Sequence, residues 1–269
     1  MGNPRISLLV PTWRNAAMMG FSMASAFEGA EPGTIEAIVF SQEHGEEVDL
    51  MVKMLQGKGH NIFIAGTSQN NEGVALAVNA CAQASRGEHL FYVADDYYFL
   101  PGWDAAMLRR VRPGTFQYLT ARCIEPTGTN PCMYAPHDFG QGLANLKEAE
   151  LLAWWGTLEK KDVASRWGPP FVERETWMAV GGFDAGYWPG MGTDPDFAMS
   201  VGKTAFNRGI QAPEYRAVGD CGMYHMGQAG TTNRVRSYGS TLASRIRFRD
   251  KWQTTPEEFG AMVGDGKEL

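Results

Sequence analysis

The chain has 269 residues and a formal net charge of −6. Hydrophobic residues make up 44% of it, which supplies a core and excludes a disordered or collagen-like chain. The negative charge gives the whole protein no general attraction to nucleic acid or anionic membranes. No apolar run is long enough for a membrane span or a signal peptide, and the four cysteines form no C-x-x-C pair. We therefore expect a soluble, cytoplasmic protein with free thiols.

The first half of the chain alternates short apolar runs with helical patterns. The expected strands are residues 6–10, 36–40, 61–65 and 90–94, and the expected helices are residues 16–27, 48–55 and 74–85. This alternation predicts βαβ units and a parallel sheet. Right-handed crossovers place the loops after the strands along one edge, where such sheets bind ligands.

The second half is less regular. It suggests strands at residues 115–124 and 170–173, helices at 145–155, 174–180 and 197–208, and a long loop at 125–142. No linker divides the chain, so we expect a single domain, residues 1–269. We divide it into a ligand-binding half (1–112), a second half (113–230) and a basic helical tail (231–269).

Two adjacent carboxylates, Asp95 and Asp96, follow the fourth expected strand, and Pro101 with Gly102 then breaks the chain. Acids at this position suit a divalent cation, because hard cations take oxygen ligands and bridge to phosphate oxygens. An ordinary solvated turn is the alternative for an isolated pair of this kind.

Several motifs over residues 5–226 together resemble the inverting family 2 of nucleotide-sugar glycosyltransferases, which have the GT-A fold. The motifs are ISLLVPTWRN at 6–15, NEG at 71–73 with Asn79, Asp95 and Asp96 with PGW at 101–103, GGFD at 181–184, GTDPDF at 192–197 and YHMG at 224–227. Each motif alone is weak, but they occur in the family's order.

The resemblance implies an α/β fold of the GT-A (Rossmann-like) type, with a mostly parallel central sheet flanked by helices and a less regular acceptor-binding half. It implies a hexosyltransferase that moves a sugar from a nucleoside-diphosphate sugar, with a UDP-sugar expected, to a hydroxyl acceptor such as a saccharide. Mn²⁺ or Mg²⁺ would assist the departure of the diphosphate. A histidine ligand would favour Mn²⁺.

The same resemblance suggests roles for particular residues. Asp96 and His225 are the expected metal ligands, and Asp194 is the expected catalytic base. The residues expected to bind the donor are Pro11, Thr12, Arg14, Ser41, Asn79 and Asp95.

Each of these roles has a structural alternative. His225 would be an ordinary core histidine, Arg14 a surface charge, and Asn79, which could orient a loop or contact the ribose, a polar residue on a helix face. For Asp194 and Asp196 the alternative is an N-cap of the following helix, and we assign Asp196 as a cap or an acceptor contact.

Three positions depart from the family pattern. The loop that begins at Ser41 lacks the aspartate that the family has after the second strand. Ala94 stands where the first acid of D-x-D is expected, and Thr193 stands where a glutamate is expected before Asp194. These changes motivate one alternative function, a non-catalytic module that binds nucleotide sugars.

The tail supplies another alternative. Residues 234–251 contain five arginines and one lysine against a single aspartate, and the simplest interpretation is a solvated amphipathic helix. Arg234 or Arg236 would otherwise close over the diphosphate. An anionic acceptor is a third interpretation, in which Arg245, Arg247 and Arg249 track its backbone and the acceptor is a hydroxylated base in DNA.

Overall fold

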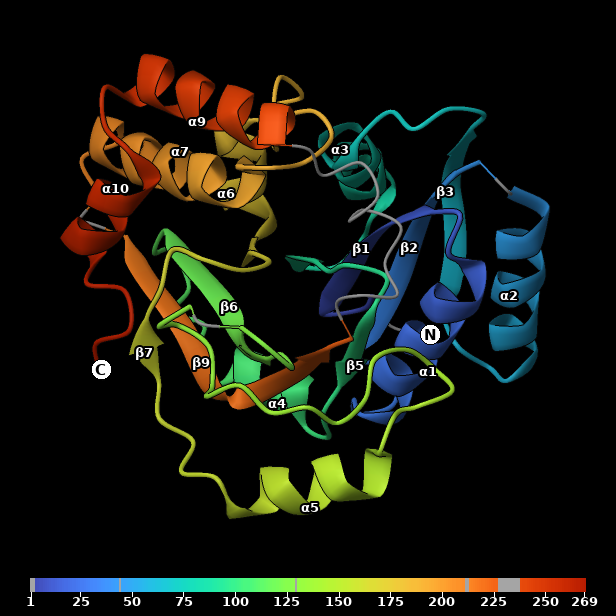
Figure 1. Cartoon of the computed structure of the whole chain (residues 1–269). Coiled ribbons are helices and arrows are strands. Elements are labelled where there is room, and N and C mark those ends of the chain that lie inside the picture. The colour runs from blue at the N-terminus through green and yellow to red at the C-terminus, as the bar shows by residue number, and fades with distance from the viewer. Residues whose placement is uncertain (1–2, 44, 129, 211–212, 227–237) are drawn as a thin grey trace.

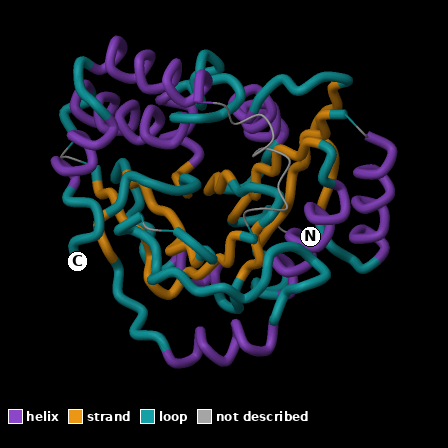
Figure 2. Tube along the Cα trace, viewed as in Figure 1, coloured by secondary structure: helices purple, strands orange, loops and turns teal. Residues whose placement is uncertain are grey.

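The computed structural model describes residues 3–43, 45–128, 130–210, 213–226 and 238–269 (Figure 1). Within these ranges the strands join into one sheet with helices packed on both of its faces (Figure 2). The strands are β1 (Ile6–Trp13), β2 (Ile35–Gln42), β3 (Ile62–Ser68), β4 (His89–Tyr92), β5 (Tyr97–Phe99), β6 (Gln117–Ile124), β7 (Val163–Ala164), β8 (Phe171–Glu173) and β9 (Glu214–His225). The helices are α1 (Ala16–Glu28), α2 (Gly45–Gly57), α3 (Val74–Ala84), α4 (Trp103–Leu108), α5 (Glu148–Thr157), α6 (Arg174–Val180), α7 (Thr193–Asn207), α9 (Tyr238–Trp252) and α10 (Pro256–Val263).

The order of strands across the sheet is β3-β2-β1-β4-β8-β6-β9-β5, and β7 pairs with β9. The first four strands are parallel, which confirms the βαβ prediction. Beyond β4 the sheet is mixed, because β8 runs antiparallel to both β4 and β6 while β6 and β9 are parallel. The predicted α/β class is confirmed.

The core lies on both faces of this sheet. On one face, α1, α2 and α4 cover residues such as Leu8 and Phe91. On the other, α3, α6, α7, α9 and α10 cover residues such as Leu9 and Tyr118. This alternation along one strand is expected for strands that are buried on both sides. In the described part of the chain, no helix is both long and apolar enough to cross a membrane.

Strand β1 does not end at Pro11, as the sequence suggested, but continues to Trp13. Its pairing with β2 runs over this whole length, whereas its pairing with β4 ends at Leu9 opposite Tyr92. Proline cannot donate a hydrogen bond to a neighbouring strand, so it is tolerated where one side of the strand is unpaired. Pro11 lies on such a stretch, and β1 and β4 separate beside it.

Two strands next to the site, β5 and β9, were not predicted. Residues 97–99 leave the turn after Asp96 as a separate short strand, which pairs antiparallel with the end of β9. In this register Tyr97 lies opposite His225. The pairing therefore joins the turn that follows β4 to a segment far along the chain.

Helix α7 begins at Thr193, four residues before the predicted start at Phe197. Its N-cap is Gly192, whose φ of 85° is in the left-handed region that glycine adopts without strain, and no side chain caps the helix. The prediction that Asp196 caps this helix is therefore wrong. Asp194 and Asp196 both lie in its first turn.

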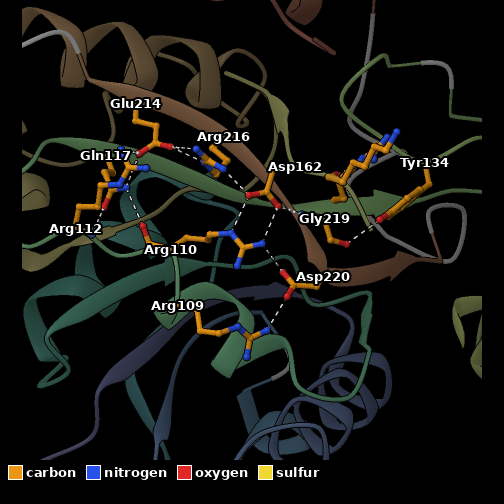
Figure 3. A network of polar contacts seen from close by, with 12 residues as sticks. Arg109, Arg110, Arg112, Gln117, Tyr134, Asp162, Glu214, Arg216, Gly219 and Asp220 are labelled. Carbon is orange, nitrogen blue, oxygen red and sulfur yellow. Dashed lines mark hydrogen bonds and ion pairs between the residues drawn. The ribbon is translucent and has the colours of Figure 1, made fainter. Parts of the chain in front are cut away.

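A network of charges holds β9 in place (Figure 3). Asp162 is buried, and its carboxylate accepts hydrogen bonds from Arg110 at 2.8 and 3.2 Å, from Arg216 at 2.5 Å and from the Gly219 N–H at 2.9 Å. Arg110 follows α4, and the other two partners belong to β9. Charge-assisted bonds of this kind are stronger than neutral ones, so Asp162 fastens β9 to the end of α4.

We predict that Asp162→Asn destabilises the fold by about 1–3 kcal/mol at neutral pH, because the partly buried Arg110 and Arg216 lose the carboxylate that they share. Burial raises the pKa of Asp162, but the bonds from Arg110, Gly219 and Arg216 outweigh it and hold the pKa below its ordinary value. The free energy of unfolding of the wild type should therefore exceed that of Asp162→Asn above the unfolded pKa of about 4. This difference should be lost as the pH falls through the lower pKa of the folded state.

Urea unfolding of both proteins between pH 7 and pH 3 measures this difference. The exposed pair partner Asp49 provides the control, since Asp49→Asn removes only a surface ion pair with Lys53. A difference between wild type and Asp162→Asn that does not shrink in acid would contradict the assignment.

Candidate active site at the carboxyl edge of the sheet

The turn between β4 and β5 brings Asp96 against His225. His225 Nε2 lies 3.3 Å from Asp96 Oδ1, and the backbone N–H of Met226 donates to the Asp96 carbonyl at 3.1 Å. The other ring nitrogen, His225 Nδ1, lies 2.6 Å from Glu125 Oε1. The structure therefore brings together the two residues predicted as metal ligands and adds Glu125 behind the histidine.

These carboxylates also control the charge of the histidine. Partial burial lowers the pKa of His225, but Asp96 and then Glu125 outweigh it and raise the pKa to about 10. Each ring nitrogen faces one carboxylate, so this arrangement fixes the plane of the ring as well as its position. An imidazole oriented by a carboxylate on its far nitrogen is the usual arrangement of a metal-binding histidine.

Asp95 is held by the end of β1 and by the loop that follows it. Thr12 Oγ1 donates to one carboxylate oxygen at 2.6 Å, and Asn15 Nδ2 donates to the other at 3.1 Å. Burial and the neighbouring Asp96 raise the pKa of Asp95 to about 7, although the bonds from Thr12 and Asn15 oppose this shift. Thr12 is itself buried, so its hydroxyl serves Asp95.

A pocket opens where β1 and β4 separate. It is lined by Pro11, Trp13, Gln42, Asn71, Val74, Tyr92, Ala94, Asp95 and Pro189. Of the residues predicted to bind the donor, only Pro11 and Asp95 are among these.

The other predicted residues of the β1 and β2 loops lie outside the pocket lining. Ser41 is fully buried and its hydroxyl lies 3.4 Å from the Glu43 carbonyl, so the next residue, Gln42, reaches the pocket instead. Arg14 is half exposed, forms an ion pair with Glu43 and lies over the ring of Trp13. Both Arg14 and Glu43 have positive φ angles, 52° and 56°, which are uncommon for residues other than glycine.

Asn79 has a role in positioning a loop. Its amide nitrogen donates to the Phe183 carbonyl at 2.8 Å, and its amide oxygen accepts from the Phe183 N–H at 2.9 Å. Both polar atoms of Asn79 are therefore occupied by the GGFD segment, so it orients this loop and does not line the pocket.

One of the carboxylates that act on the buried thiol of Cys123 on β6 is that of the predicted base Asp194. Burial is the main cause of the raised pKa of Cys123, and the carboxylates of Glu125, Asp194 and Asp96 each raise it further. Asp194 also raises the pKa of the buried Tyr118 on the same strand.

Two residues of this region were missed in the sequence. Glu125 directly follows β6 and Gln42 ends β2. Both residues could have been chosen as site candidates, because each is an acid or amide within two residues of the end of a predicted strand. Glu125 was passed over because it begins a loop without any period.

The tail arginines that were predicted to contact phosphate groups fall into two groups. Arg234 and Arg236 lie outside the described residues. Arg245, Arg247 and Arg249 lie on α9 and face Glu257, Asp184 and Asp250 respectively, at 2.5, 2.8 and 3.6 Å. Because each cation has an acidic neighbour, these three arginines do not form a continuous basic patch.

The residues present fit a divalent cation. Two ligands of one such ion, each about 2.1 Å from it at a right angle, lie about 3 Å apart, close to the Asp96–His225 separation. In the described residues no cluster of three or more His, Cys, Asp or Glu side chains is arranged to hold a metal. Asp96 and His225 are thus the candidate pair, with Glu125 behind them.

A parallel first half whose strand ends form a pocket, joined to a mixed second half, is the GT-A architecture of glycosyltransferases. The model of the family described as Glycosyl transferase family 2 matches residues 7–153, which is more than half of the chain. The chain belongs to this family and is a glycosyltransferase. No curated protein matches it significantly in sequence.

Solved structures agree on the fold. The mannosyltransferase PcManGT from Pyrobaculum calidifontis, in complex with GDP-Man and Mn²⁺, superposes with a TM-score of 0.61 at 14% identity, over 98% of this chain and 69% of that one. GalNAc-T7 with UDP, GalNAc and Mn²⁺ gives 0.66 at 12% identity, over 96% and 50%. S. aureus TarS 1-349 gives 0.57 at 14%, over 82% and 60%. The chain therefore spans only part of each of these proteins.

We predict that Asn79→Ala lowers stability by about 1–3 kcal/mol, because it leaves the Phe183 backbone groups without partners. Affinity for UDP should change by less than about twofold, which corresponds to well under 1 kcal/mol. Thermal unfolding and calorimetric titration measure the two quantities. A large loss of UDP affinity at unchanged stability would instead support a donor contact by Asn79.

Proposed function

We propose that this glycosyltransferase transfers a sugar from a nucleoside-diphosphate sugar, with a UDP-sugar as the expected donor, to a hydroxyl acceptor such as a saccharide. The transfer is metal-dependent and inverts the anomeric carbon. The observation that carries the proposal is the pair Asp96 and His225, 3.3 Å apart, next to the pocket that Asp95 lines.

The pocket suits the nucleoside end of the donor. Trp13, Pro11 and Tyr92 offer apolar surface, while Gln42, Asn71 and Asp95 offer polar groups, a mixture typical of small-molecule sites. The Gln42 side-chain oxygen already accepts from the Glu72 N–H at 2.7 Å, which orients its amide. In this proposal Gln42 takes the place of the aspartate absent from the β2 loop. Pro11 and Asp95 contact the donor, and Arg14 reaches it from the rim.

Asp96 and His225 are the side chains that would hold Mn²⁺ or Mg²⁺ near the diphosphate. Such an ion supplies a positive charge that stabilises the leaving diphosphate. Glu125 keeps His225 Nε2 directed toward Asp96 through its contact with Nδ1. The nitrogen ligand favours Mn²⁺, and the structures of PcManGT and GalNAc-T7 both contain Mn²⁺.

Asp194 is the proposed base. As the acceptor oxygen attacks the anomeric carbon, the bond to the diphosphate oxygen breaks and the hydroxyl proton passes to the Asp194 carboxylate. A single displacement by the acceptor inverts the configuration. The half-buried position of Asp194 in the first turn of α7 allows it to reach a bound acceptor.

We predict that UDP raises the melting temperature more with Mn²⁺ than without it, because a ligand that binds only the native state stabilises by mass action. Asp96→Ala should abolish the Mn²⁺-dependent part of this shift. The exposed acid Asp250 supplies the control variant, Asp250→Ala. GDP is run beside UDP to identify the nucleotide. An unchanged Mn²⁺-dependent shift in Asp96→Ala would contradict the metal role.

We predict that Asp194→Asn reduces kcat for donor turnover by about 10²–10⁴-fold, the contribution typical of a general base, with little change in UDP affinity. Release of UDP from UDP-glucose, UDP-galactose and UDP-N-acetylglucosamine is the assay. NMR of the released sugar, recorded before mutarotation, gives the anomeric outcome. Retention of configuration, or full activity in the variant, would refute this part of the proposal.

A further inference from the structure

Helix α9 contacts both acid-bearing motifs of the acceptor half. Arg247 Nη2 donates to both carboxylate oxygens of Asp184 at 2.8 Å. Lys251 Nζ donates to Asp184 at 3.0 Å and to Asp196 at 2.9 Å. A single ammonium group thus bridges the GGFD segment and the first turn of α7, with which α9 lies side by side (Figure 1).

The carboxylate of Asp196 is enclosed on all sides. Its side chain is 3% exposed, and Oδ1 accepts from Trp252 Nε1 at 2.7 Å and from the Tyr187 hydroxyl at 2.9 Å, while Oδ2 binds Lys251. A buried carboxylate is stable only when it is paired and hydrogen-bonded. Asp196 therefore depends on α9 for two of these three partners.

The surface that receives α9 is shaped for these contacts. A Cβ at Gly186 would lie 2.1 Å from the guanidinium carbon of Arg247, so a larger residue there would force Arg247 to shift. Arg247 also lies over the ring of Tyr187, with 5.2 Å to its centroid. Burial raises the pKa of Asp184, but the bonds from Arg247, Gly186 and Lys251 lower it to about 2.

Other cations of α9 do not take part. The side chain of Arg249 is 62% exposed and that of Arg245 is 56% exposed, whereas that of Lys251 is 33% exposed. The contacts therefore select one side of the helix, which the simple expectation of a solvated basic helix does not explain.

We propose that α9 positions the catalytic turn: Lys251 and Trp252 hold Asp196, and thereby fix the backbone that presents Asp194 to the acceptor. Asp194 and Asp196 are two residues apart in the same helical turn, so a displacement of one moves the other. Lys251 and Trp252 are positioning residues for transfer, and this role rests on the proposed function of Asp194 as the base.

The test compares Lys251→Met and Trp252→Phe with the matched control Arg249→Met on the same helix. UDP release from the three UDP-sugars with Mn²⁺ should show kcat reduced about 10- to 100-fold in the first two variants, the scale expected when a catalytic group is misplaced by about 1 Å. The Kd for UDP with Mn²⁺ should stay within about twofold, since the donor pocket is formed by other elements. Lys251→Arg should restore part of kcat, and Arg249→Met should match wild type.

Two results would overturn the proposal: wild-type kcat in a folded Lys251→Met, or a loss of kcat explained entirely by weaker donor binding. Trp252→Phe removes one N–H and keeps the ring, so it gives the answer if Lys251→Met does not fold. Hydrogen exchange of residues 193–197 separates this proposal from the proposed reaction. If the wild type does not turn over these donors, the reaction fails, while unchanged exchange in Lys251→Met would independently refute the positioning role.

Discussion

The site depends on the antiparallel pairing of β5 with β9. Residues 95 and 96 follow β4, His225 lies at the end of the last described strand, and the register Tyr97 opposite His225 makes them neighbours. The Met226 N–H bond to the Asp96 carbonyl extends the pairing beyond the strands themselves. Buried charges such as Asp96 and His225 are costly alone, so the pairing of strands and the pairing of charges stabilise one another.

Much of the fold could be predicted from the sequence, because local patterns determine it. The four parallel strands are apolar runs separated by helices, and strands buried on both faces have that signature. The acid turn was also accessible, since the ends of such strands meet at one edge. Asp95 and Asp96 were found in this way, whereas Pro11 came from the resemblance to the family. The motifs added His225 and Asp194, which no local pattern would have connected to that edge.

The remaining features depend on contacts between distant segments. Glu125 lies behind His225 because β6 and β9 pair, and the two residues are far apart in the sequence. Asn79 bonds to the backbone of Phe183, which is also distant in the sequence. Ser41 and Gln42 are neighbours on β2 and face opposite sides of the sheet. An error of one residue in the predicted position therefore selects Ser41, which does not line the pocket, in place of Gln42, which does. The partners of Asp196 come from α9 and the GGFD loop, and a sequence gives no register between such elements.

Pro11 has a consequence for how open this enzyme stays. The Leu9 carbonyl accepts from the Val93 N–H, and backbone groups alternate sides along a strand, so residue 11 directs its backbone nitrogen toward β4 as well. That nitrogen carries no hydrogen, and the ladder between β1 and β4 cannot extend by its next bond. Thermal motion that draws the two strands together therefore gains no hydrogen bond at this position, which favours an open pocket between β1 and β4 even without a ligand.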